Sequence, residues 1–328
     1  MSVLVTGVAG FIGSHVAATL CGAGHEVVGL DDLSGGFTDN IPAGVCFYQG
    51  SILDQPLLAE VFTKHKIKYI FHLAAYAAEG LSHFIRNFNY TNNLVGSVNL
   101  INQAVKHKVQ CFVFTSSIAV YGSGKTPLRE DHTPNPEDPY GIAKYAVELD
   151  LKAAHYMFGL NYIIFRPHNV YGEHQNISDR YRNVIGIFMN QIMNDQPMTL
   201  FGDGSQTRCF SYVGDVAPCI ANAINLPEAQ NEVFNIGSSC TTPVKDLASM
   251  VADAMGAKCN IHYCEARKEV LHAVANHSKI ERILGYRAKY DLRDGLNRMA
   301  VWAKTIGPRK PTVFSHIEVC SNLPKIWS

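Results

Sequence analysis

The stretch Thr6-Gly7-Val8-Ala9-Gly10-Phe11-Ile12-Gly13 decides the fold class of this 328-residue chain. It follows a short apolar run, Ser2–Val5, and leads into a segment of helix length, Ile12–Gly22. The three glycines are spaced GxxGxxG, and glycine at these places permits a tight turn, the close approach of a pyrophosphate and close packing of helix against strand. The first helix would point its free N–H groups and its positive dipole end at the phosphates. The pattern therefore predicts a dinucleotide-binding βαβ unit.

A carboxylate at the end of the next apolar run indicates which dinucleotide is bound. Asp31 closes the run Glu26–Leu30 and stands 18 residues after Gly13. There it can accept hydrogen bonds from both hydroxyls of an adenosine ribose, and its charge would repel a 2′-phosphate. The sequence predicts NAD as the cofactor rather than NADP.

Short apolar runs alternate with segments of helix length through the first half of the chain. The runs do not alternate strictly with polar residues, which is typical of parallel strands buried on both faces. They are Ser2–Val5, Glu26–Leu30, Tyr69–Leu73, Cys111–Thr115 and Tyr162–Arg166. The helical segments between them are Ile12–Gly22, Pro56–His65, Asn93–Lys106 and Tyr140–Phe158. This order predicts an α/β fold with a doubly wound parallel sheet of the Rossmann kind.

The pattern changes after about residue 168. Residues 172–178 are polar and loop-like, a helix is expected over Val184–Asn194, and strands are expected over Met198–Phe201 and Glu232–Ile236, the last of which could rejoin the main sheet. We predict an NAD-binding domain from residues 1–167 plus about 206–237. A smaller mixed α/β substrate-binding lobe would take about 168–205 plus 238–305. The sequence gives no role to the tail, residues 306–328.

Composition and charge argue against several classes of function. Lys plus Arg and Asp plus Glu number 28 each, so the zero net charge does not favour broad binding to nucleic acid or to a membrane surface. No apolar run approaches the roughly 18 residues that cross a membrane. The nine cysteines are odd in number without a CxxC pair, and the 14 histidines form no HExxH pattern. We therefore expect reduced thiols in the cytoplasm and no metal site. The chain opens on its first strand without a signal-type segment, which fits the same location.

Three polar side chains form a candidate catalytic set. Ser117 follows the strand Cys111–Thr115, at the carboxyl edge where catalytic groups of an open α/β sheet lie. Tyr140 and Lys144 stand at i and i+4 of an expected helix and so share one face. An ammonium and a positively charged nicotinamide near the phenol would lower the pKa of Tyr140 from about 10 towards neutrality. Such a tyrosine can act as a general base on a substrate hydroxyl.

These residues and several later motifs resemble the extended short-chain dehydrogenase/reductases and, within them, the nucleotide-sugar 4-epimerases. The resemblance covers nearly all of residues 1–305. Its motifs are TGxxGFIGSH from Thr6, Asp31-Asp32-Leu33-Ser34, His72-Leu73-Ala74-Ala75, Asn92, TSSxAVYG from Thr115, YxxxK from Tyr140, Arg166-Pro167-His168-Asn169-Val170-Tyr171-Gly172, FGDGSQTR from Phe201, Asn235-Ile236-Gly237 and Leu284-Gly285-Tyr286. The resemblance implies an NAD-dependent isomerase of carbohydrate metabolism. It would invert C4 of UDP-glucose/galactose or UDP-N-acetylglucosamine/galactosamine through a transient 4-keto sugar.

The resemblance also assigns roles to individual residues. Tyr140 would be the base, Ser117 would bond the sugar hydroxyl, and Lys144 would hold the nicotinamide ribose. The nucleotide sugar would be bound by Ser117, Tyr140, Asn169, Arg208, Arg267 and Ala273. The cofactor would be bound by Gly7, Gly10, Phe11, Ile12, Gly13, Asp31, Asp32, Ser34, Ile52, Asp54, Leu73, Ala74, Ala75, Asn92, Ser116, Tyr140, Lys144 and Pro167.

Family members often form homodimers through the helices that hold Asn93–Lys106 and Tyr140–Phe158, so a homodimer is expected. The apolar residues Val147, Leu151 and Ala154 are consistent with such a contact, and they would serve equally well as core.

Departures from the family pattern bear on the reaction. Ile118 and Ala119 follow Ser117 where 4,6-dehydratases and uronic acid decarboxylases need an extra acid or base, which ranks those reactions lower. Ser51 replaces an aspartate that contacts adenine in many relatives, and the nearby Asp54 is a weak substitute.

Other departures bear on the substrate. The segment after Arg267 differs from the usual RxGD motif by what would be a one-residue deletion, which places Ala273 at a gate position. A small gate admits an N-acetyl group at sugar C2. The alternatives left open are a uronic acid 4-epimerase, for which Arg180 and Arg182 follow the relevant loop, a 3,5- or 5-epimerase, a dehydratase, a reductase, and a non-catalytic NAD-binding regulator.

Overall fold

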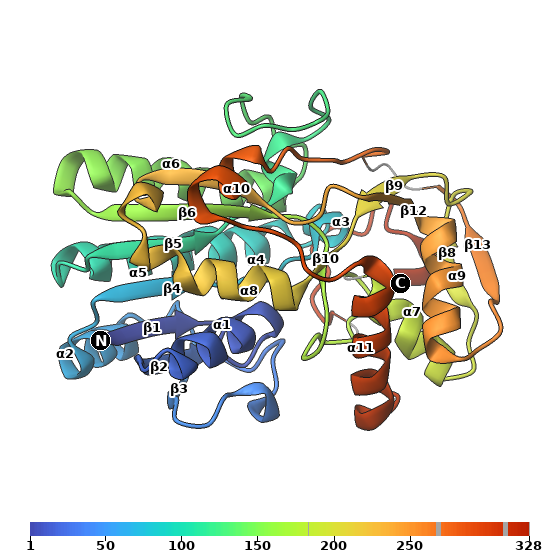
Figure 1. Ribbon diagram of the computed structural model, residues 1–328, viewed down its shortest axis with the longest axis horizontal. Helices are drawn as coiled ribbons and strands as arrows, with labels where there is room; N and C mark the ends of the chain where they lie inside the picture. Colours follow the sequence, from blue (N-terminus) through green and yellow to red (C-terminus); the bar gives the residue numbers. More distant parts are fainter. Residues whose placement is uncertain (183, 267–269, 311–313, 328) are drawn as a thin grey trace.

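A seven-stranded sheet forms the centre of the computed structural model, which describes residues 1–182, 184–266, 270–310 and 314–327 (Figure 1). Every neighbouring pair of its strands is parallel. The strands in spatial order are β11 (Glu232–Ile236), β6 (Asn161–Pro167), β5 (Cys111–Thr115), β4 (Tyr69–His72), β1 (Ser2–Thr6), β2 (Glu26–Asp31) and β3 (Cys46–Gln49). The predicted doubly wound α/β fold is confirmed, because the order reverses direction at β1 and β4 as the chain winds outward from the middle.

Helices cover both faces of this sheet. Val3 and Val5 of β1 belong to one buried core, whereas Leu4 between them belongs to the other, as the two-residue period of a strand requires. The first core is closed by α1 (Phe11–Gly22) and α8 (Val213–Asn222). The second is closed by α2 (Gln55–His65), α5 (Gly96–Lys106) and α6 (Pro139–Phe158).

Smaller elements lie beyond the carboxyl ends of the sheet strands, on the right of Figure 1. Three short pairs of strands are β7 (Val170–Tyr171) with β10 (Ser211–Tyr212), β8 (Met198–Phe201) with β13 (Ile261–Cys264), and β9 (Thr207–Cys209) with β12 (Thr241–Pro243). The helices α7 (Val184–Met193), α9 (Val244–Met255) and α11 (Leu292–Ile306) pack against one another beside them. A further helix, α10 (Ser278–Leu284), packs against β11.

The prediction that Glu232–Ile236 rejoins the main sheet is confirmed, since β11 pairs with β6. The strand β3 was not predicted. It is a four-residue edge strand whose side chains are half-buried or exposed, so it lacks the continuous apolar run of its neighbours. The helix expected over Asn93–Lys106 begins earlier, as α4 (Arg86–Tyr90), continues through a π-helical turn (Thr91–Val95) and becomes α5.

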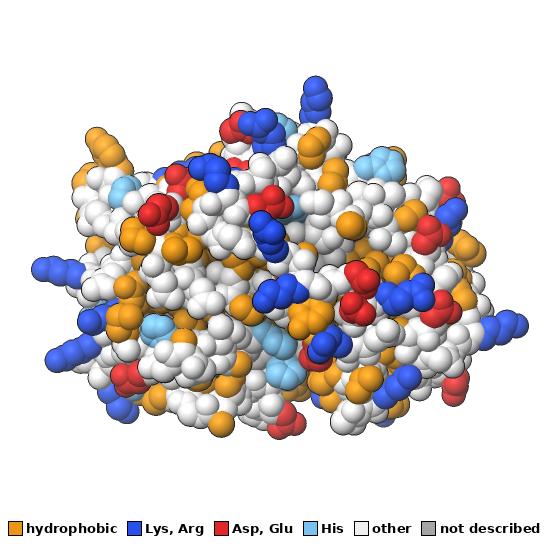
Figure 2. Space-filling view, viewed as in Figure 1, with side chains coloured by type: hydrophobic (Ala, Val, Ile, Leu, Met, Phe, Trp, Pro, Cys, Tyr) orange, Lys and Arg blue, Asp and Glu red, His pale blue; other side chains and the backbone are white. Residues whose placement is uncertain are grey.

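Charged side chains of both signs are interspersed on the face of the molecule in Figure 2. In the part of the chain that the structure describes, no helix has the length and apolarity to cross a membrane. Within the same residues, no group of three His, Cys, Asp or Glu side chains is placed to hold a metal ion.

Candidate active site

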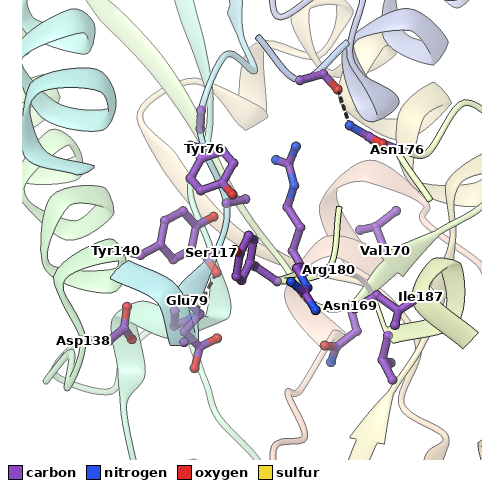
Figure 3. Close-up of a pocket in the computed structure, with 18 of the residues that line it drawn as sticks. Tyr76, Glu79, Ser117, Asp138, Tyr140, Asn169, Val170, Asn176, Arg180 and Ile187 are labelled. Carbon is purple, nitrogen blue, oxygen red and sulfur yellow. Dashed lines mark hydrogen bonds between the residues drawn. The ribbon is translucent and has the colours of Figure 1, made fainter. Parts of the chain in front are cut away.

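A cleft of about 1910 Å³ opens at the carboxyl ends of the sheet strands. A pocket for one small ligand usually measures about 300–1000 Å³, so this cleft has room for a dinucleotide and a second ligand. Figure 3 shows Tyr140 and Ser117 on one side of it and Asn169 on the other. The sequence-predicted residues that line the cleft are Gly7, Gly10, Phe11, Ile12, Gly13, Asp31, Asp32, Ser34, Ile52, Leu73, Ala74, Ala75, Asn92, Ser116, Ser117, Tyr140, Lys144, Pro167, Asn169, Arg208 and Ala273.

Two predicted site residues are not among them. Asp54 does not line the cleft. Its side chain caps α2 by accepting a hydrogen bond of 3.0 Å from the backbone N–H of Leu57, so its proposed contact with the cofactor is not supported. Arg267 lies outside the described residues.

The glycine turn after β1 forms one end of the cleft. Gly7 has a φ of +74°, and a Cβ there would lie 2.7 Å from the backbone nitrogen of Ala74. A Cβ on Gly13 would lie 2.0 Å from the carbonyl oxygen of Gly7, so glycine lets α1 pack onto the turn. Gly10 stands at the N-cap of α1 without a side-chain cap, which leaves N–H groups of the first turn directed to the cleft. These features fit a bound pyrophosphate.

The carboxylate of Asp31 is buried at the end of β2. Its two oxygens accept hydrogen bonds from the backbone N–H groups of Ala9, at 3.0 Å, and Leu33, at 2.8 Å. Burial raises the pKa of Asp31, and these backbone hydrogen bonds oppose that shift. A carboxylate has about four lone-pair sites, so two such bonds leave acceptor capacity for ribose hydroxyls. The site thus fits the adenosine end of NAD.

The π-helical turn places two asparagines differently. Asn92 lines the cleft. Asn93 is buried and holds the segment after β4, because its side chain bonds the backbone N–H of Tyr76 at 2.9 Å and the carbonyl of Tyr76 at 3.1 Å. Such π turns inside helices are frequent at functional sites.

Tyr140 stands in the first turn of α6. Asp138 caps this helix by accepting a hydrogen bond of 2.9 Å from the N–H of Gly141, and Pro139 occupies the first helical position. The phenol lines the cleft, yet the residue is 7% exposed. Burial raises the pKa of Tyr140 above its ordinary value, and the hydrogen-bonding Ser117 hydroxyl is the largest opposing influence.

Lys144 lies one turn further along α6 and is also buried. Its ammonium nitrogen donates a hydrogen bond of 2.8 Å to the carbonyl oxygen of Thr115, and it lies 5.8 Å from the centre of the Tyr140 ring. Burial lowers the pKa of Lys144 to about 7, an effect that Glu148 opposes. Desolvation of the buried phenol outweighs the influence of its protein neighbours. The lowered pKa expected for Tyr140 requires the charge of a bound nicotinamide as well as that of Lys144, and it stays a prediction.

The two serines after β5 have different partners. The Ser116 hydroxyl donates a hydrogen bond of 2.6 Å to the buried carboxylate of Glu148, so its proton is already used within the core. The Ser117 hydroxyl accepts a hydrogen bond of 3.1 Å from the N–H of Ala119 and lies beside Tyr140 in the cleft (Figure 3).

The opposite side of the cleft carries the predicted sugar and phosphate residues. Asn169 has a φ of +42°, and its side-chain nitrogen donates a hydrogen bond of 3.1 Å to the carbonyl of Cys209. The guanidinium of Arg208 is oriented by the carbonyl oxygens of Thr207, at 2.9 Å, and Leu271, at 3.0 Å. Ala273 presents a small side chain to the same space.

Sequence reasoning missed several residues of the cleft wall. Tyr76 and Glu79 belong to the segment between β4 and α4, in which no motif stands out; Glu79 begins the short helix α3 (Glu79–Ser82). Arg180 and Arg182 were noted only as following the loop, and both line the cleft. Residues of the tail between Val319 and Trp327 also line the cleft, and the composition of the tail does not predict this position.

Comparisons with known proteins agree with this geometry. The profile of the NAD dependent epimerase/dehydratase family matches residues 3–237. The chain is 33% identical to the UDP-glucose 4-epimerase of Mycolicibacterium smegmatis over 304 residues, which cover 90% of this chain and 96% of that one.

Solved structures of similar proteins have the same fold. The UDP-glucose 4-epimerase of Thermotoga maritima, solved with UDP-glucose, is 33% identical with a TM-score of 0.88, over 93% of this chain and 99% of that one. The UDP-glucuronic acid 4-epimerase of Bacillus cereus, solved with UDP-glucuronic acid and NAD, is 29% identical with a TM-score of 0.86, over 93% of this chain and all of that one. With its glycine turn, Asp31 and the Ser117–Tyr140–Lys144 set in one cleft, the chain belongs to the NAD-dependent epimerase/dehydratase family, within the extended short-chain dehydrogenase/reductases.

Proposed function

We propose that this enzyme inverts C4 of a UDP-linked hexose, either glucose/galactose or the N-acetylamino counterpart, through a transient 4-keto sugar. One observation carries the proposal. The phenol of Tyr140 and the hydroxyl of Ser117 face a single cleft that has a dinucleotide cradle at one end and Asn169 and Arg208 at the other. A sugar carbinol held between these two ends would meet a base and a redox cofactor together.

NAD, when bound, supplies the capacity to accept a hydride from C4 of the sugar and to return it. Tyr140 takes the proton of the C4 hydroxyl as the carbonyl forms and gives it back when the alcohol is restored. Ser117 bonds the same oxygen and keeps it beside the phenol. Lys144, whose ammonium donates a hydrogen bond to the carbonyl of Thr115, would hold the nicotinamide ribose.

The other half of the cleft would hold the diphosphate while the sugar turns. Return of the hydride to the opposite face requires the keto sugar to rotate about its phosphate linkage. Arg208 is suited to hold the diphosphate in place while the sugar rotates, because a planar guanidinium matches phosphate oxygens. Hydrogen bonds to the carbonyls of Thr207 and Leu271 help to orient it. Asn169 would bind near the reacting ring.

The side chains near Ser117 favour epimerisation over dehydration. Ile118 and Ala119 follow Ser117 in a short 3-10 turn and carry no group that can donate or accept a proton. The presence of both Tyr140 and Lys144 in the cleft favours an enzyme over a non-catalytic NAD-binding regulator.

A UDP-linked uronic acid is a second candidate substrate, favoured by Arg180. Figure 3 draws this side chain projecting into the middle of the cleft. Over the described residues, no hydrogen-bond or ion-pair partner of Arg180 is found, whereas Arg182 is held by Asp179 at 2.8 Å. A guanidinium in such a place suits a carboxylate on sugar C6.

A homodimer is proposed through the outer face of α6. Val147, Leu151 and Ala154 are buried in the core of their own chain and are not available to a partner. Ile142 and Leu149 point outward instead, with 41% and 48% of their surface exposed. A cytoplasmic location is supported by the cysteines, all nine of which are free.

The reaction is tested by incubating the enzyme with UDP-, GDP- and dTDP-sugars, UDP-glucuronate included, and reading the products by NMR. We expect C4 inversion of UDP-glucose or UDP-N-acetylglucosamine without net reduction of NAD. Loss of water, net reduction of NAD or inversion at C3 or C5 would contradict the proposal. Activity on UDP-glucuronate alone, abolished by Arg180→Met, would select the second candidate.

A further inference from the structure

The tail after α11, which the sequence left without a role, is anchored across the cleft wall. The carboxylate of Glu318 accepts hydrogen bonds from the backbone N–H groups of Asn87, at 2.7 Å, and Phe88, at 2.8 Å. The N–H groups of Glu318 and Val319 both donate to the carbonyl of Phe84, at 2.8 and 3.2 Å. These bonds fasten the tail to α4 and to the residues just before it.

An apolar cluster holds the end of the tail. Trp327 is 4% exposed. Its ring lies 5.4 Å from that of Tyr181 and 6.3 Å from that of Phe84, edge to face in both cases, and 6.4 Å from that of Phe201 on β8. The tail therefore connects two parts of the cleft wall. One is the segment that carries Glu79, and the other is the strand β8, which precedes Arg208 in the chain. Figure 1 places the C-terminus in the half of the molecule that holds β8, α7 and α9, away from the N-terminus.

The inner side of this bridge faces ligand space. Residues between Val319 and Trp327 line the same cleft as Tyr140 and Arg208, and Lys325 is among them. Asp31, which we assign to the adenosine end of the cleft, lies at the end of β2 and not in the tail. An aromatic cluster and a cation in one wall suit a ligand that combines a heterocycle with phosphates.

We propose that the segment Phe314–Trp327, which we call the strap, is part of the nucleotide-sugar site. It closes the wall of the substrate half of the cleft, and Lys325 contributes to the binding of the nucleoside diphosphate. The inference rests on the proposed function and deepens it.

A fluorescent reporter inside the strap gives a test that does not depend on turnover. The chain has two tryptophans, Trp302 on α11 and Trp327 in the strap. In a Trp302→Phe variant, emission comes from Trp327 alone. Titration with UDP, GDP and dTDP should change this emission for the nucleotide that calorimetry shows to bind, and NAD alone should leave it unchanged.

A matched pair of variants tests Lys325. Lys325→Met should raise the KM for the nucleotide sugar about tenfold, the order expected for the loss of one charge-assisted contact, with kcat and the Kd of NAD nearly unchanged. Lys310→Met is the control, because Lys310 lies in the same tail, is exposed and does not line the cleft. Lys310 and Lys325 are both exposed, so neither substitution leaves a cavity in the core and both proteins should fold.

Two results would overturn the inference, and they are distinguishable. If a nucleoside diphosphate binds while Trp327 emission stays constant and Lys325→Met behaves like Lys310→Met, the strap is only structural and the proposed function survives. If no nucleoside diphosphate binds the wild-type chain, the proposed function fails and the strap proposal fails with it.

Discussion

The ammonium nitrogen of Lys144 is tied to the carbonyl oxygen of Thr115 by a hydrogen bond of 2.8 Å. The bond joins the first turns of α6 to the last residue of β5, and it holds the cation 4.8 Å from the centre of the Phe114 ring. Lys144 is therefore positioned by the sheet edge, and it lies within reach of the Tyr140 ring without being bonded to it. Burial of the cation has a measurable consequence for stability.

Lys144→Met should stabilise the protein near neutral pH although it removes activity. Burial lowers the pKa of Lys144 from 10.5 to about 7, so at pH 7 and below the folded protein bears the full penalty of a buried charge. Between pH 7 and 10.5 the unfolded chain holds a proton that the folded protein has lost, and the free energy of unfolding of the wild type should rise with pH. The advantage of the variant should shrink over this range.

Chemical denaturation of both proteins at several pH values measures this difference. Lys152→Met, on an exposed position of the same helix, is the control and should show no such trend. A wild type that loses stability relative to Lys144→Met as the pH rises from 7 to 10 would contradict the prediction.

Tyr140→Phe should abolish most turnover and keep cofactor binding. Loss of a general base reduces a rate by roughly 10²- to 10⁴-fold. The glycine turn and Asp31 do not depend on the phenol, so calorimetry should find the Kd of NAD within a few-fold of the wild type. Turnover by NMR that stays within tenfold of the wild type would remove Tyr140 from the mechanism.

Glu148→Gln should strongly destabilise the fold. Glu148 and Arg166 are 0% and 2% exposed and form a bidentate pair with N–O distances of 2.5 and 2.9 Å. Removing one partner leaves a buried charge without compensation, which costs about 3–5 kcal/mol. Denaturant titration should show that loss. Asp131→Asn is the control, because its pair with Arg129 is exposed to solvent and should contribute little to stability. Equal small losses from both variants would be inconsistent with this account of the core.

Ala273→Tyr should separate the two hexose substrates. Ala273 lines the cleft with a small side chain, and a bulky residue there would exclude an N-acetyl group at sugar C2. We expect kcat/KM for UDP-N-acetylglucosamine to fall by more than about tenfold and that for UDP-glucose to change little, since a steric clash acts only on the larger substrate. Equal loss on both sugars would defeat the idea of a gate.

Much of this fold was predictable from local sequence, because buried parallel strands such as β5 are short continuous apolar runs and the glycine turn must follow the first of them. The edge strand β3 was not predictable in this way, since its side chains are half-exposed. The paired positions of Tyr140 and Lys144 follow from helical periodicity alone.

Other features of the site depend on contacts between distant segments. The raised pKa of Tyr140 reflects how deeply the phenol is buried, which spacing does not reveal. The cofactor contact predicted for Asp54 is not supported, because a carboxylate just before a helix can cap that helix as readily as it can bind a ligand. The tail reaches the cleft through Glu318 and Asn87, which are 231 residues apart, so no local pattern could place it.

The central claim is that Tyr140 removes and restores the proton of the C4 hydroxyl, while the hydrogen on C4 is transferred as a hydride and never leaves the enzyme. Incubation of the enzyme with UDP-glucose carrying deuterium at C4, in ordinary water and with product analysis by NMR, tests this most directly. The account predicts UDP-galactose that retains the deuterium at C4, and Tyr140→Phe should form almost none. Deuterium lost to solvent, or a product whose C4 configuration is unchanged, would contradict it.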